Sequence, residues 1–389
     1  MQMKKRTILA FIGCYLPGYR AGGPIRTMVN LVARLGDEFD FYIVTMNRDL
    51  GSVEPYASVA TDAWNTVGKA QVFYASSKGS SFRSLINIMR GTPHDILYLN
   101  GFFHPVFTLK PILIRKLFSS VRKPTIVAPH GEFSPGALNL KRRKKQLFMA
   151  VEKLGGLFNN VIWHASTSFE AKDIANARAV SEDKVIIATN IVAKLSAGEC
   201  RNETLKFSDS RPLSICFLSR ISPMKNLDFA LSVLMGLSKP IEFFIYGPKE
   251  DAVYWKVCEE IIESLPLNIS VTYQGSVSPV DVKKTISNHD VFFVPTQGEN
   301  FGHVFIEAFS AGVPVLVSNR TPWRGLKAKN IGWDISLDQP HEFRDAIEDM
   351  LTWTAEQHRN VHNACLRFAE QLSESDDAVE MHRKLFSNA

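Results

Sequence analysis

A chain of 389 residues, 45% of them hydrophobic and 22% charged, is long enough for two or three domains and has the composition of a folded globular protein. These values exclude a low-complexity or disordered chain. The formal net charge of +6 favours an anionic partner, such as a nucleotide or a phospholipid headgroup. We expect no nucleic-acid partner, since zinc-finger spacing and RNA-binding aromatic signatures are missing from the sequence.

The first apolar run, Ile8–Leu16, is interrupted by Gly13 and followed by Pro17. A membrane span needs about 20 residues, and no signal-peptide cleavage pattern follows this run. We therefore interpret the run as a buried first strand of a cytoplasmic protein. The five cysteines are scattered and form no C-x-x-C pair, which favours free thiols over a disulfide framework or a cysteine metal site.

Short apolar strands alternate with helical patterns along the first half of the chain. Continuous apolar runs of this kind are typical of strands buried on both faces of a parallel sheet. The predicted strands are Thr7–Cys14, Phe39–Thr45, Gln71–Tyr74, Ile96–Leu99, Thr125–Pro129, Val161–Ala165 and Lys184–Ala188. The predicted helices between them include Pro24–Leu35, Leu138–Leu157 and Ser168–Ala177.

The pattern becomes polar between Ile191 and Pro212 and then starts again, which indicates a domain boundary. Predicted strands follow at Leu213–Leu218, Ile241–Tyr246, Ile269–Gln274, Val291–Pro295 and Val313–Ser318. Predicted helices lie at Leu227–Leu237, Val253–Ser264, Val280–Asn288 and Phe301–Ala311. We expect an N-terminal Rossmann-like domain at 1–195, a second one at 205–375, and a tail at 376–389 that packs back on the first. In two such doubly wound α/β domains, a ligand belongs at the carboxyl ends of the strands, in the crevice between them.

The segment after the strand ending at Pro295 is the richest in candidate site residues. The amides of Asn300, Phe301 and Gly302 stand at a predicted helix start, where unpaired N–H groups and the helix dipole attract phosphate. Glu299 and Glu307 are eight positions apart and could accept hydrogen bonds from sugar and ribose hydroxyls. The alternative is one glutamate favoured by the helix dipole and one solvated glutamate.

Three further loops follow predicted strands. Arg220 and Lys225 offer two cations that suit a diphosphate leaving group, or else form a solvated basic turn. Gly22 and Gly23 allow a ligand to approach the backbone, or else make a plain turn. His130 could bond a sugar or a phosphate, although a lone loop histidine is more often structural.

Together these residues resemble the family 4 glycosyltransferases, a retaining family with the GT-B fold. The resemblance is carried by Arg220…Lys225, the E-x7-E pair with its Asn-Phe-Gly filling, the Gly-Gly loop and the His130-Gly131 step, and it covers nearly the whole chain in the right order. The E-x7-E segment with its trailing Ala-Gly-Val-Pro-Val is its most specific part.

The resemblance implies a role for each matched residue. Arg220 and Lys225 would hold the donor diphosphate and stabilise it as it leaves. Glu307 would bind the ribose hydroxyls, Glu299 would face the transferred sugar, and His130 would contact that sugar near its anomeric carbon. The amides of Asn300, Phe301 and Gly302 would line the donor pocket, with Gly22 and Gly23 closing over the diphosphate. The family generally needs no bound metal, so we expect neither a metal nor another cofactor.

One segment departs from the family pattern. Many members carry a Gly-Gly-x-x-Glu turn after the Pro-Val-Leu strand of the second domain, where this chain has Thr321-Pro322-Trp323-Arg324. No ligand role is assigned to this turn, and stacking of Trp323 on a nucleotide base is only a hypothesis.

The basic run Lys141–Lys145 leads into the apolar stripe of the predicted helix 138–157. Such a segment can lie on an anionic membrane surface, and family members often use lipid-linked acceptors. The alternatives are a stripe buried in the core, or a cluster that binds an acceptor phosphate.

We therefore expect a retaining hexosyltransferase that moves a sugar from a UDP- or GDP-linked donor to a glycan or lipid-linked acceptor in cell-surface polysaccharide synthesis. The expected location is the cytoplasm, with contact at the inner face of the membrane through Lys141–Lys145. Two alternatives stay open: another GT-B enzyme such as a sugar-nucleotide epimerase, and a non-catalytic protein that binds nucleotide sugars.

Overall fold

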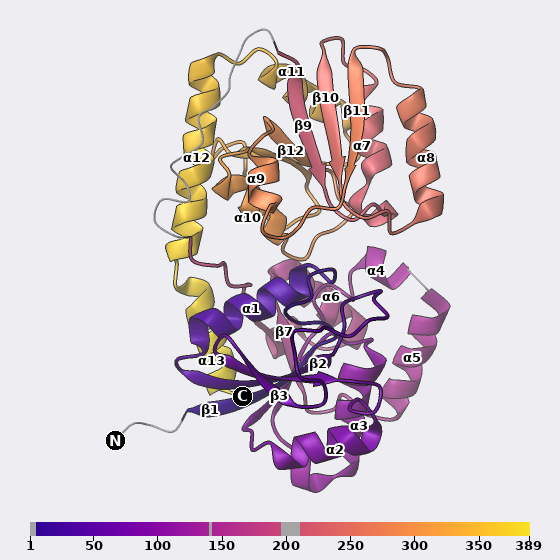
Figure 1. The fold of residues 1–389 in the computed structure, drawn as a ribbon, viewed down its shortest axis with the longest axis vertical. Coiled ribbons are helices and arrows are strands. Elements are labelled where there is room, and N and C mark those ends of the chain that lie inside the picture. Colours follow the sequence, from indigo (N-terminus) through magenta and orange to yellow (C-terminus); the bar gives the residue numbers. More distant parts are fainter. Residues whose placement is uncertain (1–4, 140–141, 196–210) are drawn as a thin grey trace. The chain divides into compact units, whose positions relative to one another are not determined.

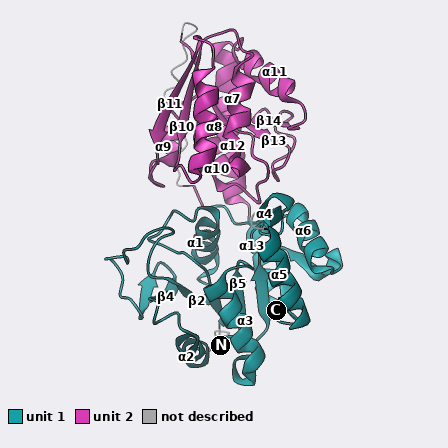
Figure 2. Cartoon of the chain, turned by 90° about the vertical axis from the view of Figure 1, so that its right-hand side faces the viewer, with its two compact units in different colours: residues 1–193, 376–389 teal, residues 194–375 magenta. Residues whose placement is uncertain are grey.

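The computed structural model describes residues 5–139, 142–195 and 211–389. The chain forms two compact units, residues 1–193 with 376–389 and residues 194–375 (Figure 2). Most of the predicted boundary segment, together with Cys200 and Lys141, lies outside the described residues.

The N-terminal unit contains an eight-stranded sheet in the order β3-β4-β2-β1-β5-β6-β7-β8 (Figure 1). Its strands are β1 Arg6–Phe11, β2 Phe39–Met46, β3 Trp64–Val67, β4 Ala70–Ala75, β5 Ile96–Asn100, β6 Thr125–Ala128, β7 Ile162–Ala165 and β8 Val185–Ile187. Pairing is parallel except between β3 and β4, which form a hairpin at the sheet edge. Buried apolar side chains fill both faces, as continuous apolar strands require.

Helices cover this sheet, and two of them replace one predicted helix. The helices are α1 Gly23–Leu35, α2 Phe82–Gly91, a π-helical turn Pro105–Leu109, α3 Lys110–Leu117, α4 Pro135–Asn139, α5 Arg142–Leu154, α6 Ser168–Arg178 and α13 Asp377–Ser387. The prediction of one helix over 138–157 is therefore wrong. Its C-terminal end is three residues too long because Gly155 and Gly156, the latter with φ of 55°, follow the last turn.

The last helix, α13, is part of the core of the N-terminal unit. The Phe386 ring is fully buried, with its centroid 5.6 Å from that of Phe39 and 5.5 Å from that of Tyr98. Arg6 Nη1 donates to the carbonyl oxygen of Phe386 at 2.7 Å, which ties the helix to the first strand. Residues 380 positions apart in the sequence thus share one core.

The C-terminal unit contains a six-stranded sheet of wholly parallel strands in the order β11-β10-β9-β12-β13-β14 (Figure 1). The strands are β9 Leu213–Leu218, β10 Ile241–Tyr246, β11 Ile269–Gly275, β12 Val291–Val294, β13 Val315–Ser318 and β14 Gly332–Ile335. The helices are α7 Leu227–Leu234, α8 Ala252–Glu263, α9 Val282–Ile286, α10 His303–Ser310, α11 Pro340–Met350 and α12 Ala355–Glu374, with a 3₁₀ turn at Pro223–Lys225. The predicted α/β class with two doubly wound, mainly parallel sheets is confirmed.

No helix within the described part of the chain combines the length and the apolarity that crossing a bilayer requires.

Truncation of Phe386 to alanine should destabilise the N-terminal unit by about 3–5 kcal/mol, because it leaves a cavity among buried rings. The measurement is urea unfolding followed by fluorescence. Met381 is 39% exposed on the same helix, and Met381→Ala is the matched control. Equal stability of the two variants would contradict the core role of Phe386.

Candidate functional site

Four loops of the C-terminal unit meet at the carboxyl ends of its strands. These are the loops after β9, β10, β12 and β13, which leave the same edge because the strands are parallel. Backbone bonds connect them: Ile221 N to Pro248 O at 2.9 Å, Gln297 N to Met224 O at 2.8 Å, and Glu299 N to the carbonyl oxygen of Arg320 at 3.1 Å. The residues predicted on separate loops of this unit therefore belong to one connected surface.

Asn226, which the sequence analysis did not identify, joins two of these loops. It has a left-handed backbone with φ of 62°, a conformation that asparagine tolerates better than most residues. Its buried side chain donates to Pro295 O at 2.9 Å and accepts from Gln297 Nε2 at 3.0 Å. Asparagine directly before a helix was the available signal for this role.

Lys225 and Glu299 form an ion pair of 2.5 Å between the loops after β9 and β12. Their side chains are only 15% and 19% exposed, so this pair is partly shielded from solvent screening. Arg220 pairs with Glu250 at 3.0 Å, but both side chains are nearly half exposed. Exposed pairs of this kind contribute about 0–1 kcal/mol, so an anionic ligand can replace Glu250 at small cost.

The helix α10 begins at His303, two residues later than predicted, because Gly302 has φ of 80° and cannot continue an α-helix. A side chain at position 302 would stand 2.5 Å from the ring of Phe305, so only glycine fits there. The amides of Asn300, Phe301 and Gly302 consequently lie in the loop before the helix. The first-turn N–H groups belong to His303 and the residues that follow it.

Glu307 and Trp323 differ in their burial and in their contacts near the start of α10. Glu307 is half-buried in the second turn of α10. Trp323 is 9% exposed, and its indole Nε1 donates to Phe301 O at 2.5 Å while its ring packs 5.6 Å from the ring of Phe301. Its position in the core argues against stacking on a nucleotide base. Trp323 instead holds the loop that leads into α10.

In the N-terminal unit, the Gly-Gly loop follows β1 and begins α1. Gly22 has φ of 70°, and a Cβ atom on Gly22 or Gly23 would meet no atom within 4 Å. The backbone is therefore open to approach by a ligand. The carboxylate of the buried Asp49 accepts from the amides of Tyr19 and Arg20 at 3.0 and 3.2 Å and holds the preceding turn. Asp49 was not identified from the sequence.

His130 follows β6 and has a left-handed backbone with φ of 52°. Its Nε2 atom lies 3.0 Å from Oδ1 of Asn100, at the end of the adjacent strand β5. Burial lowers the pKa of His130 to about 4, so the imidazole is neutral at pH 7. With Asn100 accepting, Nε2 carries the single proton of the neutral ring, and Nδ1 is left as a hydrogen-bond acceptor.

A buried carboxylate, that of Glu170, and a half-buried one, that of Glu132, hold the loops around His130. Glu170 accepts from Gly131 N at 2.6 Å, from Ser166 N at 2.7 Å and from Ser166 Oγ at 2.8 Å. Glu132 accepts from the amides of Phe102 and Phe103 at 2.5 and 3.1 Å, and burial raises its pKa. The glutamates thus bind backbone N–H groups and set the path of the chain. No local sequence pattern signals this role of Glu170, which lies 40 positions from His130.

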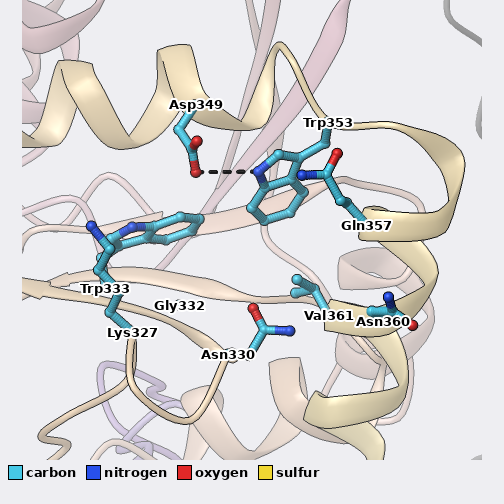
Figure 3. A pocket seen from close by; sticks show the side chains of 9 residues that line it. All are labelled: Lys327, Asn330, Gly332, Trp333, Asp349, Trp353, Gln357, Asn360 and Val361. Atoms are coloured by element: carbon cyan, nitrogen blue, oxygen red, sulfur yellow. Dashed lines mark hydrogen bonds between the residues drawn. The ribbon is translucent and has the colours of Figure 1, made fainter.

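A hollow of about 340 Å³ lies elsewhere on the C-terminal unit, between β14 and the helices α11 and α12 (Figure 3). Its walls include the indoles of Trp333 and Trp353, which stack with centroids 5.8 Å apart. Trp353 Nε1 donates to Asp349 at 3.2 Å. None of the residues predicted for the site lines this hollow. Across residues 5–139, 142–195 and 211–389, no three His, Cys, Asp or Glu side chains gather in an arrangement suited to a metal ion.

Comparison with known proteins finds a family match within the C-terminal unit. Residues 203–366 match the family described as glycosyl transferases group 1. An uncharacterized 41.2 kDa protein from the cps region of Klebsiella pneumoniae is 23% identical over 320 residues, which are 80% of this chain and 84% of that protein. The O-antigen biosynthesis glycosyltransferase WbnH of Escherichia coli is 25% identical over 183 residues, or 46% of this chain and 47% of that protein.

The fold also matches a solved structure over its length. HepE of Anabaena, crystallised in complex with UDP and glucose, aligns with a TM-score of 0.65 at 16% identity, covering 98% of this chain and 99% of that one. The GT-B fold predicted from the sequence is confirmed by this match.

Replacing Glu170 by glutamine should lower the free energy of unfolding of the N-terminal unit by about 1–3 kcal/mol. The amide would turn an NH₂ group toward a backbone N–H that now has a carboxylate acceptor. Thermal unfolding measures the change. Glu182 is exposed in the same unit, so Glu182→Gln is the control. An equal effect of both substitutions would exclude the role of Glu170 in holding the loops around His130.

Proposed function

Because residues 203–366 of this chain belong to the glycosyl transferases group 1 family, we propose that this glycosyltransferase uses the loops of its C-terminal unit to hold a nucleotide-diphosphate sugar. The observation that carries the proposal is the partly buried pair of Lys225 and Glu299, which joins the two loops that the family resemblance assigns to donor binding. The donor is a UDP- or GDP-linked sugar. The transfer proceeds with retention at the anomeric carbon.

The diphosphate binds beside Arg220 and Lys225, where two cations stabilise the charge that develops on the leaving group. In the structure this positive charge is balanced by Glu250 and Glu299. Binding of the diphosphate to Lys225 releases Glu299, whose carboxylate then accepts hydrogen bonds from hydroxyls of the transferred sugar. The Lys225–Glu299 pair is therefore a preformed binding site, in which the diphosphate replaces Glu299 as the partner of Lys225.

The remaining donor contacts come from α10 and from the N-terminal unit. Glu307 binds the ribose hydroxyls, and the loop amides of Asn300, Phe301 and Gly302 line the pocket. Gly22 and Gly23 offer open backbone to the diphosphate. His130, held neutral by burial and with its Nε2 proton on Asn100, accepts at Nδ1 a hydrogen bond from a hydroxyl of the sugar near the anomeric carbon.

The acceptor is a glycan or a lipid-linked glycan of a cell-surface polysaccharide. The relatives from a cps region and from O-antigen biosynthesis support this class of acceptor. The protein acts in the cytoplasm at the inner face of the membrane, which it contacts through the basic segment 141–145. An anionic surface would attract this segment.

The test is a screen of binding and slow hydrolysis across UDP-, GDP-, ADP- and dTDP-sugars. One donor should bind preferentially, and both Lys225→Ala and Glu307→Ala should weaken that binding about tenfold or more, since each removes a charge-assisted contact. The exposed residues of α8 supply matched controls, Lys256→Ala and Glu260→Ala, which should bind the donor like the parent chain. Proton NMR of the released sugar should show the anomeric configuration of the donor.

Each alternative has its own outcome in this screen. An epimerised free sugar nucleotide would establish an epimerase and overturn the transferase proposal. Donor binding without hydrolysis or transfer, with Lys225→Ala changing affinity alone, would establish a non-catalytic binding protein. Failure of all four donor classes to bind would overturn the proposal that these loops form a donor site.

A further inference from the structure

The hollow between β14, α11 and α12 lies away from the loops proposed to hold the donor. Its lining includes Gly332, the first residue of β14, and Asn330 just before that strand. The hollow therefore lies beside the amino end of β14. In a parallel sheet the amino ends of the strands lie on the edge opposite to the carboxyl ends, from which the loops of the candidate site leave. A ligand in this hollow is thus separate from the donor.

The hollow has an apolar floor and a polar rim. Trp333 is 8% exposed, and Gly332 and Val361 are buried beside it. The rim consists of exposed residues with polar side chains, namely Lys327, Asn330, Asp349, Gln357 and Asn360. Pockets for small ligands combine apolar walls with a few polar groups and have volumes of about 300–1,000 Å³. The volume of about 340 Å³ places this hollow at the small end of that range.

The indole of Trp353 is held in place by three neighbours. It stacks on Trp333 with 22° between the ring planes, and its Nε1 donates to Asp349 at 3.2 Å. The ring of His358 packs against it at 74°, with the centroids 5.2 Å apart. Figure 3 shows both indoles at the hollow, with Asn330 below them in that view. Because these contacts fix the Trp353 ring before a ligand arrives, stacking on it loses little conformational entropy.

The rim offers both hydrogen-bond acceptors and donors. Asp349 presents carboxylate oxygens. In the capping box of α12, Oε1 of Gln357 accepts from the amide of Thr354 at 2.8 Å, which leaves Nε2 of Gln357 as a donor. Asn330 and Asn360 each carry an amide oxygen and an NH₂ group. A ligand with several groups that both donate and accept can therefore be bound around its edge.

The charge and shape of the hollow favour a sugar over a nucleotide. The charged residues of the lining are Lys327 and Asp349, whose charges cancel, so a phosphate group gains no net attraction there. A sugar ring has an apolar face of C–H groups and a rim of hydroxyls, each of which donates and accepts. An indole can stack on the first, and the polar side chains can bond to the second.

We propose that the hollow between β14, α11 and α12 binds a neutral sugar residue of a glycan chain, at a site separate from the donor loops. Trp353 stacks on the apolar face of the sugar ring, Asp349 accepts from its hydroxyls, and Asn360 bonds to its edge. Such a site keeps the glycan attached to the C-terminal unit while the donor is exchanged. The inference rests on the proposed function in taking this glycan to be the acceptor of the transfer, but the binding itself needs no donor.

The experiment is an NMR titration of the full chain, with ¹⁵N-labelled tryptophan, against methyl α-glucoside, methyl α-galactoside and maltotriose. The indole N–H signal of Trp353 is identified by its loss in Trp353→Phe. This signal should shift with at least one of the sugars, because they bind beside the ring. UMP, which tests the hollow for nucleotide binding, should leave the signal in place.

Substitutions in the hollow should weaken binding of the sugar that shifts this signal, with affinity measured from the broadening of the sugar's own NMR signals. Trp353→Ala should lower the affinity about tenfold, because the stacking surface is lost, whereas Trp353→Phe keeps a ring and should retain most of it. Asn360→Ala should lower it about threefold, because one hydrogen bond is lost. Asn360 is exposed, so this change leaves the core undisturbed. Asn363 is exposed on the same helix outside the hollow, and Asn363→Ala is the matched control.

Three results would overturn the inference. The first is a Trp353 signal that none of the sugars shifts. The second is a pair of variants, Trp353→Ala and Asn360→Ala, that bind the sugar as tightly as the parent. The third is a Trp353 signal that UMP shifts in preference to the sugars, which would assign the hollow to a nucleotide. A parent that binds sugar here but hydrolyses no nucleotide sugar would support this site and count against the proposed function alone.

Discussion

Parallel pairing of strands is the constraint on which the candidate site depends. A parallel strand needs a crossover before the next strand can begin, so every loop that follows a strand leaves from the same edge of the sheet. In the C-terminal unit this rule brings the loops carrying Arg220, Lys225, Glu299 and the start of α10 to one edge. In the N-terminal unit it does the same for the Gly-Gly loop and His130. The candidate site residues are far apart in the sequence. The parallel pairing of the strands brings the loops that carry them to one edge of each sheet.

The loops at these edges are held by buried polar and aromatic side chains that take no part in the proposed chemistry. Asn226 binds the backbone of the loop after β12, Glu170 binds the amide next to His130, and Trp323 binds the loop before α10. Because each of these groups is buried, leaving its partner unsatisfied would cost free energy. The loops are therefore positioned before a ligand arrives, and this preorganisation reduces the entropy lost on binding.

The sequence predicted the fold class and most central strands because continuous apolar runs such as Val291–Val294 fit only a buried strand in this context. It missed β3, whose Trp-Asn-Thr-Val run has no distinct period and pairs antiparallel at the edge. It placed the start of α10 at Phe301, because Phe301 continues the apolar pattern of the helix. The left-handed backbone of Gly302, which prevents the helix from starting there, cannot be seen in that pattern. Asn226 and Glu170 hold their loops through hydrogen bonds to residues far away in the sequence. A local sequence pattern contains no information about such contacts. The roles of the candidate site residues stay predictions.

The placement of α13 has a consequence for synthesis on the ribosome. The C-terminal unit, residues 194–375, has all of its own strands and helices once residue 375 has left the ribosome. The N-terminal unit, although translated before it, lacks the Phe386 ring from its core until α13 emerges. The C-terminal unit can thus complete its core before the N-terminal unit does, although translation of the N-terminal unit begins first. A chain truncated after residue 375 would hold every element of the C-terminal unit but would lack α13, which leaves the buried rings of the N-terminal unit without Phe386.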